Sequence, residues 1–202
     1  MSSAGHHSMM QRAGGGPLPP GARFVEYLES TGTQYIDTGV LATLAYGCKI
    51  DLEDVATASY NCFIRNLSNN DFCIGSNNSN PLSSYLRIRG ALTWANGIGA
   101  TKSFEVKNGV IKANGSQIGT YDATMPLASN ANNISLFAAV GGGTPAKCKV
   151  FSCELYDYNF TLVRDFRPIA IGTTGYMLDL VSGEYLPYGN AGTGDFVIGP
   201  DI

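Results

Sequence analysis

Short runs of β-prone residues, separated by Gly, Asn and Ser, follow one another from residue 23 to the end of the chain. No segment keeps a helical period over three turns, and the regular spacing of turn residues is typical of an all-β sandwich of two antiparallel sheets, here of the jelly-roll type. Strands are predicted near residues 23–30, 34–40, 46–54, 60–66, 71–76, 84–90, 102–107, 110–113, 117–121, 134–140, 147–157, 161–167, 176–181, 184–187 and 195–199.

Alternation within one run indicates which side chains face the core. Leu86 and Ile88 alternate with Arg87 and Arg89. Because successive side chains of a strand point to opposite faces, the two apolar residues should point inward and both arginines outward. This strand is therefore predicted to be half-buried.

Four positions predict turns, bends or ends of strands. Asn108-Gly109 and Asn114-Gly115 suit type I′ hairpin turns, where both central residues take positive φ. The alternation along residues 147–155 inverts after Val150, which predicts a β-bulge or a change of sheet there. Pro168 should end its strand because proline donates no ladder hydrogen bond.

The first 21 residues differ in composition from the remainder. They are rich in Gly, Ser and Pro and hold both histidines, His6 and His7. We interpret 1–21 as a flexible arm, either native and used for attachment to other subunits or left over from cloning, and 22–202 as one sandwich domain.

Charge and composition exclude several partners and settings. A net charge of −3 gives no basic field for nucleic acid or an anionic membrane, and no apolar run is long enough to cross a bilayer or to act as a secretory signal. The five cysteines form no CxxC pair and are expected to be reduced and buried, with Cys62 and Cys73 as the first pair to check for a bridge.

Two ends of the chain resemble one known family. Residues 24–39 (FVEYLESTGTQYIDTG) resemble the opening of concanavalin A-like, laminin-G-like domains of bacteriophage tail and other virion proteins and of gut-bacterial surface proteins. Residues 149–157 (KVFSCELYD), 162–168 (LVRDFRP), 176–185 (YMLDLVSGEY) and 192–196 (GTGDF) resemble the closing part of the same domains. The resemblance brackets nearly the whole of residues 23–199.

The resemblance implies a lectin-like sandwich with a non-enzymatic role. A phage tail or head-fibre module, carried on the virion surface and attached through its arm to other virion subunits, is the leading hypothesis. A bacterial cell-surface adhesin and a purely structural virion decoration protein stay open as alternatives. The resemblance leaves open whether the chain forms homo-oligomers.

Catalytic residues are sparse in this sequence. Residues 22–202 contain no histidine, so the usual Ser/His and Cys/His nucleophilic systems lack their base. Asp51 and Glu53 would share one face of a strand, but their spacing does not match a glucanase motif, and a glycoside hydrolase is the least favoured hypothesis. The run Gly141-Gly142-Gly143 lacks the lysine of a phosphate-binding loop.

A cofactor is not expected, although calcium is left open because related domains often bind it. Oxygen ligands for it would come from Asn69, Asn70 and Asp71 or from residues 51–54 (DLED).

Glycan binding needs an exposed aromatic ring together with amides and carboxylates. Trp94 is the only tryptophan of the chain and is the predicted anchor, although a core role for it stays open. The other candidate ligand-binding residues lie in polar loops: Asn96, Asn77, Asn78, Tyr121 and Asp122.

Overall fold

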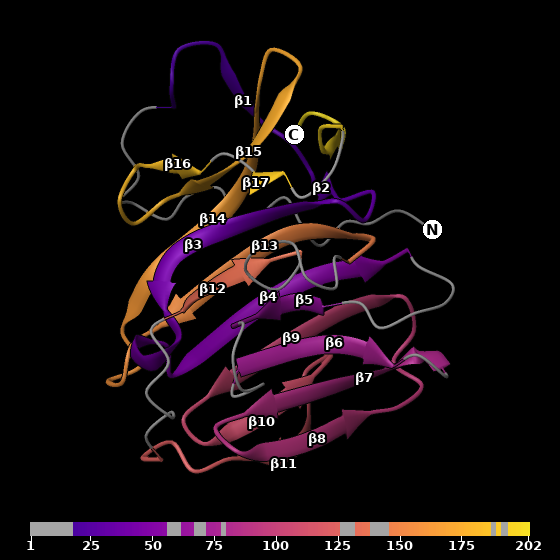
Figure 1. Cartoon of the computed structure of the whole chain (residues 1–202), viewed down its shortest axis with the longest axis vertical. Coiled ribbons are helices and arrows are strands. Elements are labelled where there is room, and N and C mark those ends of the chain that lie inside the picture. Colours follow the sequence, from indigo (N-terminus) through magenta and orange to yellow (C-terminus); the bar gives the residue numbers. More distant parts are fainter. Residues whose placement is uncertain are drawn as a thin grey trace.

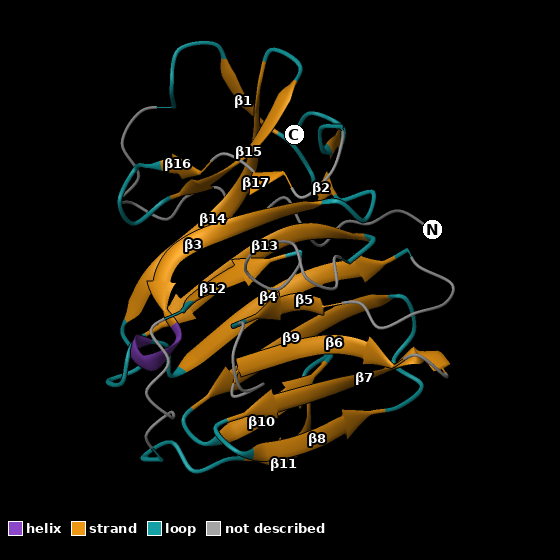
Figure 2. Ribbon diagram, in the orientation of Figure 1, coloured by secondary structure: helices purple, strands orange, loops and turns teal. Residues whose placement is uncertain are grey.

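The computed structural model describes residues 18–55, 62–66, 72–77, 80–125, 132–137, 146–186, 189–190 and 194–202. Within these residues the chain is almost entirely β-strand, and the one helical element is a 3₁₀ turn, η1 (Ala42–Leu44). The predicted fold class, an all-β sandwich of two antiparallel sheets, is confirmed (Figure 2). Most of the arm predicted at 1–21 lies outside the described residues.

The strands form two sheets. The larger sheet contains β1 (Ala22–Phe24), β2 (Leu28–Glu29), β4 (Gly47–Asp54), β9 (Thr101–Lys107), β10 (Val110–Ala113), β11 (Ser116–Thr120), β13 (Cys148–Tyr156), β14 (Leu162–Ile171), β15 (Thr174–Asp179), β16 (Tyr185–Leu186) and β18 (Val197–Ile198). The smaller sheet contains β3 (Gln34–Leu41), β5 (Cys62–Arg65), β6 (Phe72–Asn77), β7 (Asn80–Ile88), β8 (Ala91–Ala95), β12 (Asn133–Leu136) and β17 (Gly189–Asn190).

The two sheets pack with their strands in matching order. The smaller sheet has the order β17-β3-β12-β5-β6-β7-β8. Taken in the same direction, the main path of the larger sheet has the order β16-β15-β14-β13-β4-β9-β10-β11. Strands β8 and β11 therefore lie together at one end of the sandwich, and β3 and β14 lie toward the other (Figure 1). Alternate side chains of both sheets fill the space between them, among them Ile50, Phe104, Leu86 and Ile88, all fully buried. The opposite side chains form the two outer faces.

Both predicted Asn-Gly turns are confirmed. Asn108 and Gly109 have φ of 51° and 77°, and Asn114 and Gly115 have φ of 48° and 80°. The first turn joins β9 to β10 and the second joins β10 to β11. Asparagine and glycine tolerate this left-handed backbone, which matches the twist of the paired strands.

The change of alternation near Val150 is also explained. The pairing of β13 with β4 shifts register between Val150 and Ser152, as expected for a bulge. At the same point β13 leaves its short pairing with β2, in which Val150 lies opposite Leu28. The bulge therefore coincides with a change of neighbouring strand.

The expectation that Pro168 ends its strand is wrong. β14 runs on to Ile171, and Pro168 lies opposite Met177 of β15. On its other edge, β14 pairs with β13 as far as Phe166 and with β1 from Ile169 onward. Pro168 falls between these two pairings, where a missing N–H donor leaves no ladder bond unmade.

Two expectations around the β7–β8 hairpin are corrected. No strand was predicted at residues 91–95, yet β8 occupies them and pairs with β7 through a two-residue turn at Arg89 and Gly90, with φ of 46° and 80°. Arg87 is exposed as expected, but Arg89 is buried. The turn redirects the Arg89 side chain, which lies over the Tyr46 ring and donates hydrogen bonds to the carbonyl oxygens of Ala45 and Met125.

All five cysteines are buried and unbridged, as expected. Burial raises the pKa of the Cys48, Cys148 and Cys153 thiols. These three thiols pack in the core as small apolar side chains. Cys62 and Cys73, the first pair to check for a bridge, lie outside this core cluster on neighbouring strands, β5 and β6.

Candidate functional site

The outer face of the smaller sheet carries the candidate site. In β7, Leu86 and Ile88 point into the core, so Tyr85 and Arg87 point outward. The register places Trp94 opposite Tyr85 and Leu92 opposite Arg87, which puts all four side chains on one face. We call Tyr85, Arg87, Leu92 and Trp94 the β7–β8 face.

Trp94 is an exposed ring on this face. Its side chain is 45% exposed, and the neighbouring Leu92 is 53% exposed. The Trp94 and Tyr85 rings lie 6.0 Å apart between centroids, tilted by 53°. The pair forms a supported aromatic surface of the type that packs against apolar faces of ligands, so the structure places Trp94 on the surface and not in the core.

Tyr85 is held in place by side chains of the neighbouring strands β5 and β6. Its hydroxyl lies 3.4 Å from the Cys73 sulfur and 3.7 Å from the Cys62 sulfur. Burial, and then the neighbouring thiols, raise the pKa of the Tyr85 hydroxyl, which stays protonated near neutral pH. The thiol pair therefore serves as a buried support for the ring on which Trp94 rests.

Two arginines lie on the same outer face. Arg65 of β5 is opposite Cys73 of β6, and Cys73 is opposite Arg87 of β7. The row continues in the other direction to Ser135 of β12, which is opposite Arg65. The Arg65 Nη1 lies 3.7 Å from the Cys62 sulfur, while the Arg65 Nε and the Ser135 Oγ are buried and have no hydrogen-bond partner among the described residues.

The remaining arginines of the described residues have oxygen partners. Arg23 pairs with Asp201 at 2.7 Å, Arg167 with Asp165 at 2.8 Å, and Arg164 with Asp179 at 3.5 Å. Arg89 donates to two carbonyl oxygens. Within the same described part of the chain, neither Arg65 nor Arg87 has a carboxylate or carbonyl partner.

The other predicted site residues are distributed over the chain. Asn96 is exposed directly after β8 and so lies near Trp94. Asn77 ends β6, and Asn78 lies outside the described residues. Tyr121 is buried, and its hydroxyl donates to the Tyr46 carbonyl at 2.8 Å. Asp122 is exposed, and hydrogen bonds from Thr124 lower its pKa.

Tyr121 and Asp122 therefore belong to a different cluster. Burial lowers the pKa of the Arg89 guanidinium at the turn between β7 and β8, and Tyr121 and Asp122 lie close enough to oppose that shift. Asn96 lies two residues after Trp94, and the strand register places Tyr85, Arg87 and Arg65, which the sequence did not nominate, on the same outer face as Trp94. Tyr85 and Arg87 alternate with the apolar Leu86, and this pattern predicts that both point outward. Only the pairing of β7 with β8 shows that they lie beside Trp94.

The acidic residues proposed for calcium are engaged elsewhere. Asp51 accepts a hydrogen bond from the Ser152 hydroxyl at 2.9 Å, and the Glu53 carboxylate lies 3.4 Å from the Lys149 ammonium. Asp54 pairs with Lys102 at 3.0 Å. Asn69, Asn70 and Asp71, as well as the glycine run 141–143, lie outside the described residues. Within the described ranges, no group of three or more His, Cys, Asp or Glu side chains is placed to hold a metal ion.

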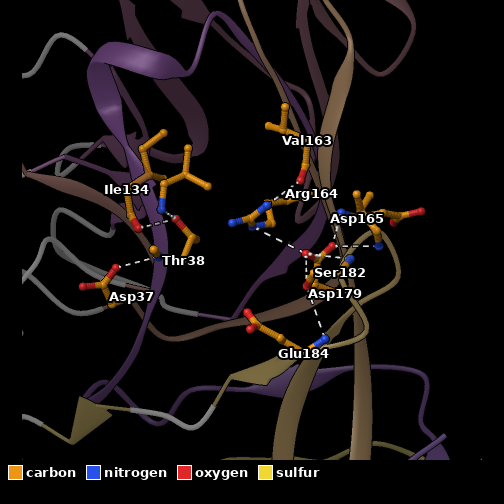
Figure 3. A network of polar contacts seen from close by, with 12 residues as sticks. Asp37, Thr38, Ile134, Val163, Arg164, Asp165, Asp179, Ser182 and Glu184 are labelled. Atoms are coloured by element: carbon orange, nitrogen blue, oxygen red, sulfur yellow. Dashed lines mark hydrogen bonds and ion pairs between the residues drawn. The ribbon is translucent and has the colours of Figure 1, made fainter. Parts of the chain in front are cut away.

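A second polar cluster joins β14 and β15 (Figure 3). The Asp179 carboxylate accepts hydrogen bonds from the backbone N–H of Asp165 at 2.9 Å and of Val181 at 3.0 Å, and from the Ser182 hydroxyl at 2.7 Å. Its second oxygen also lies 3.5 Å from Arg164. These contacts close the turn after β15, so we assign this cluster a structural role.

Comparisons with family models, with curated proteins and with solved structures returned no match to this chain. In addition, no helix in the described residues is long and apolar enough to cross a bilayer.

Proposed function

We propose that this chain is a non-enzymatic attachment module of a virion surface, a phage tail or head-fibre protein that binds host glycans through the β7–β8 face. The observation that carries the proposal is the exposure of Trp94, at 45%, on an outer sheet face where Tyr85 supports the ring. Sugar rings present apolar C–H faces, which pack well against such an aromatic surface.

The resemblance to concanavalin A-like virion domains supports a location on a virion surface. It covers residues 24–39, 149–157, 162–168, 176–185 and 192–196, which include much of β3 of the smaller sheet and of several strands of the larger sheet. The arm at 1–21 supplies a means of attachment to other virion subunits. A bacterial cell-surface adhesin would use the same face, and its different location would be evident from where the native protein is found.

Binding at a single copy should be weak. A face of this kind is open to water, so each sugar hydroxyl exchanges one hydrogen bond for another with little net gain. Repeated copies on one particle raise the overall strength of attachment by making later binding events intramolecular. Host attachment through this face therefore depends on multivalent display.

Trp94→Ala is expected to abolish this attachment. The full chain, coupled through its N-terminus to beads in many copies, should bind host cells and glycan arrays. Beads that carry the variant should bind at least about tenfold more weakly. Because Trp94 is largely at the surface, its loss should cost about 1 kcal/mol of unfolding free energy or less. Bead binding and urea unfolding measure the two effects.

Tyr185→Ala provides the matched control. Tyr185 is 44% exposed and packs edge-to-face against Tyr176 at 5.3 Å, but it lies on β16 of the larger sheet. Its removal should leave binding unchanged. Equal losses in both variants, or a destabilisation of about 3 to 5 kcal/mol in Trp94→Ala, would contradict the proposal. Absence of any binding by the wild-type beads would favour a purely structural virion role.

A further inference from the structure

The charges around Trp94 indicate what kind of glycan this face binds. The chain is acidic overall, with a net charge of −3, yet the two arginines on this outer face have no carboxylate partner in the described residues. Elsewhere in that part of the chain, Arg23, Arg164 and Arg167 are each neutralised by an aspartate. Arg65 and Arg87 therefore have no carboxylate in contact among the described residues; the nearest acidic side chain in the same row, the exposed Asp37, lies opposite Ser135 and two strands away from Arg65.

We propose that the ligand is an acidic glycan, and that Arg65 and Arg87 bind the carboxylate of one of its sugars. This inference rests on the proposed function and narrows it. A guanidinium group presents a planar fork of donors that matches the two oxygens of a carboxylate. The same fork offers much less to a neutral sugar, which has no anionic group to pair with it.

The spacing of the strands suits this arrangement. Arg65 and Arg87 lie on β5 and β7, with Cys73 of β6 between them in one row across the sheet. Strands two apart are separated by about 10 Å, which two long arginine side chains can bridge toward a shared anion. Along β7, Tyr85 is two residues from Arg87, or about 7 Å. One acidic sugar unit, or two linked units, can therefore contact the arginines and the Tyr85–Trp94 pair together.

The buried part of Arg65 points to the same ligand chemistry. Its Nε and the neighbouring Ser135 Oγ are buried, and neither has a hydrogen-bond partner in the part of the chain that the structure describes. A buried polar group without a partner carries a cost that natural proteins rarely accept without a reason. Arg65 as a whole is half-buried, and the hydrogen bond that its guanidinium makes within the described residues goes to the thiol of Cys62, which lies 3.7 Å from Nη1 and is only a weak acceptor, so an anionic acceptor over this row would be a stronger partner for the guanidinium.

Matched pairs of sugars test the inference. The full chain, displayed on beads, is assayed against trigalacturonate and its methyl ester, which differ only in their carboxyl groups, and against 3′-sialyllactose and lactose, which differ by one sugar unit that carries a carboxylate. We expect the acidic member of a pair to bind at least about tenfold more tightly at low salt. Arg87→Gln and Arg65→Gln should each remove most of this preference, and Arg87→Lys should restore only part of it because it keeps the charge without the fork.

Lys147→Gln is the charge-matched control. Lys147 is exposed and precedes β13 of the larger sheet, so this variant changes the net charge equally without touching the site. Equal Trp94-dependent binding of acidic and neutral sugars would overturn this inference and leave the proposed function standing. Binding of dextran sulfate but of neither carboxylated sugar would overturn the carboxylate assignment. Binding of no glycan at all would overturn both proposals. Because Arg87 is exposed, its variants should fold even if those of Arg65 do not.

Discussion

Replacing Lys102 by Met is expected to lower the free energy of unfolding by about 3 to 5 kcal/mol. The Lys102 ammonium lies 3.0 Å from Asp54, and the two side chains are 0% and 2% exposed. The ammonium also lies 5.3 Å from the centre of the Phe63 ring. Removing the cation leaves the Asp54 carboxylate buried in the core without its counter-charge, which is the costly way to break a buried pair. Urea unfolding of the two proteins measures the difference.

An exposed ion pair in the same sheet provides the control. Lys112 lies 3.2 Å from Glu105, and these side chains are 40% and 37% exposed. Lys112→Met should change the free energy of unfolding by no more than about 0.5 to 1 kcal/mol, since water and salt screen such a pair. The double variant Lys102→Met, Asp54→Leu should recover most of the lost stability. A loss in Lys102→Met no larger than that in Lys112→Met would contradict the assignment.

Asp179→Ala is expected to lower the free energy of unfolding by about 2 to 4 kcal/mol, the second large effect. The Asp179 side chain accepts hydrogen bonds from the backbone of β14 at Asp165 and from the turn at Val181 and Ser182, and it is almost fully buried. Alanine leaves the buried Asp165 N–H without this acceptor and releases the turn, while water can reach the more exposed donors. Denaturant unfolding reports the loss, and Asp179→Asn should recover part of it.

A comparable turn with a half-buried aspartate, whose hydrogen bonds are exposed to water, controls for this result. Asp157 accepts hydrogen bonds from the backbone N–H of Asn159 at 2.9 Å and of Thr161 at 2.8 Å. Because these bonds are exposed to water, Asp157→Ala should cost only about 0.5 to 1 kcal/mol. If Asp179→Ala and Asp157→Ala lowered the free energy of unfolding by similar amounts, burial of Asp179 would not be the reason for its contribution to stability.

The features of the fold that the sequence predicted well are those with local causes. The Asn108-Gly109 turn depends on the two residues that form it, and the bulge after Val150 is visible as a local inversion of alternation. Strand β8 was missed because its turn, Arg89-Gly90, places a non-glycine residue at positive φ without the usual asparagine or aspartate. The continuation of β14 through Pro168 depends on two distant neighbours, β13 and β1, whose pairing no local pattern contains.

Of the candidate site on the β7–β8 face, the sequence nominated only Trp94. Trp94 is the one tryptophan of the chain, and its type alone made it a candidate. Tyr85, Arg65 and Arg87 join it through the register of β5, β6, β7 and β8, which is fixed by pairing across strands. Tyr121 seemed equally suitable from its polar surroundings, but its ring is buried and its hydroxyl bonds to the chain itself.

The intrinsic fluorescence of Trp94 tests the central claim most directly, because the chain has no other tryptophan and all such emission comes from the site itself. Titration of the full chain with 3′-sialyllactose or trigalacturonate should produce a saturable shift of the emission as the ligand covers the exposed ring. Arg87→Gln should move the midpoint to at least about tenfold higher ligand concentration. Binding of either ligand, measured by calorimetry, with no change in Trp94 emission would contradict the placement of the glycan site on the β7–β8 face.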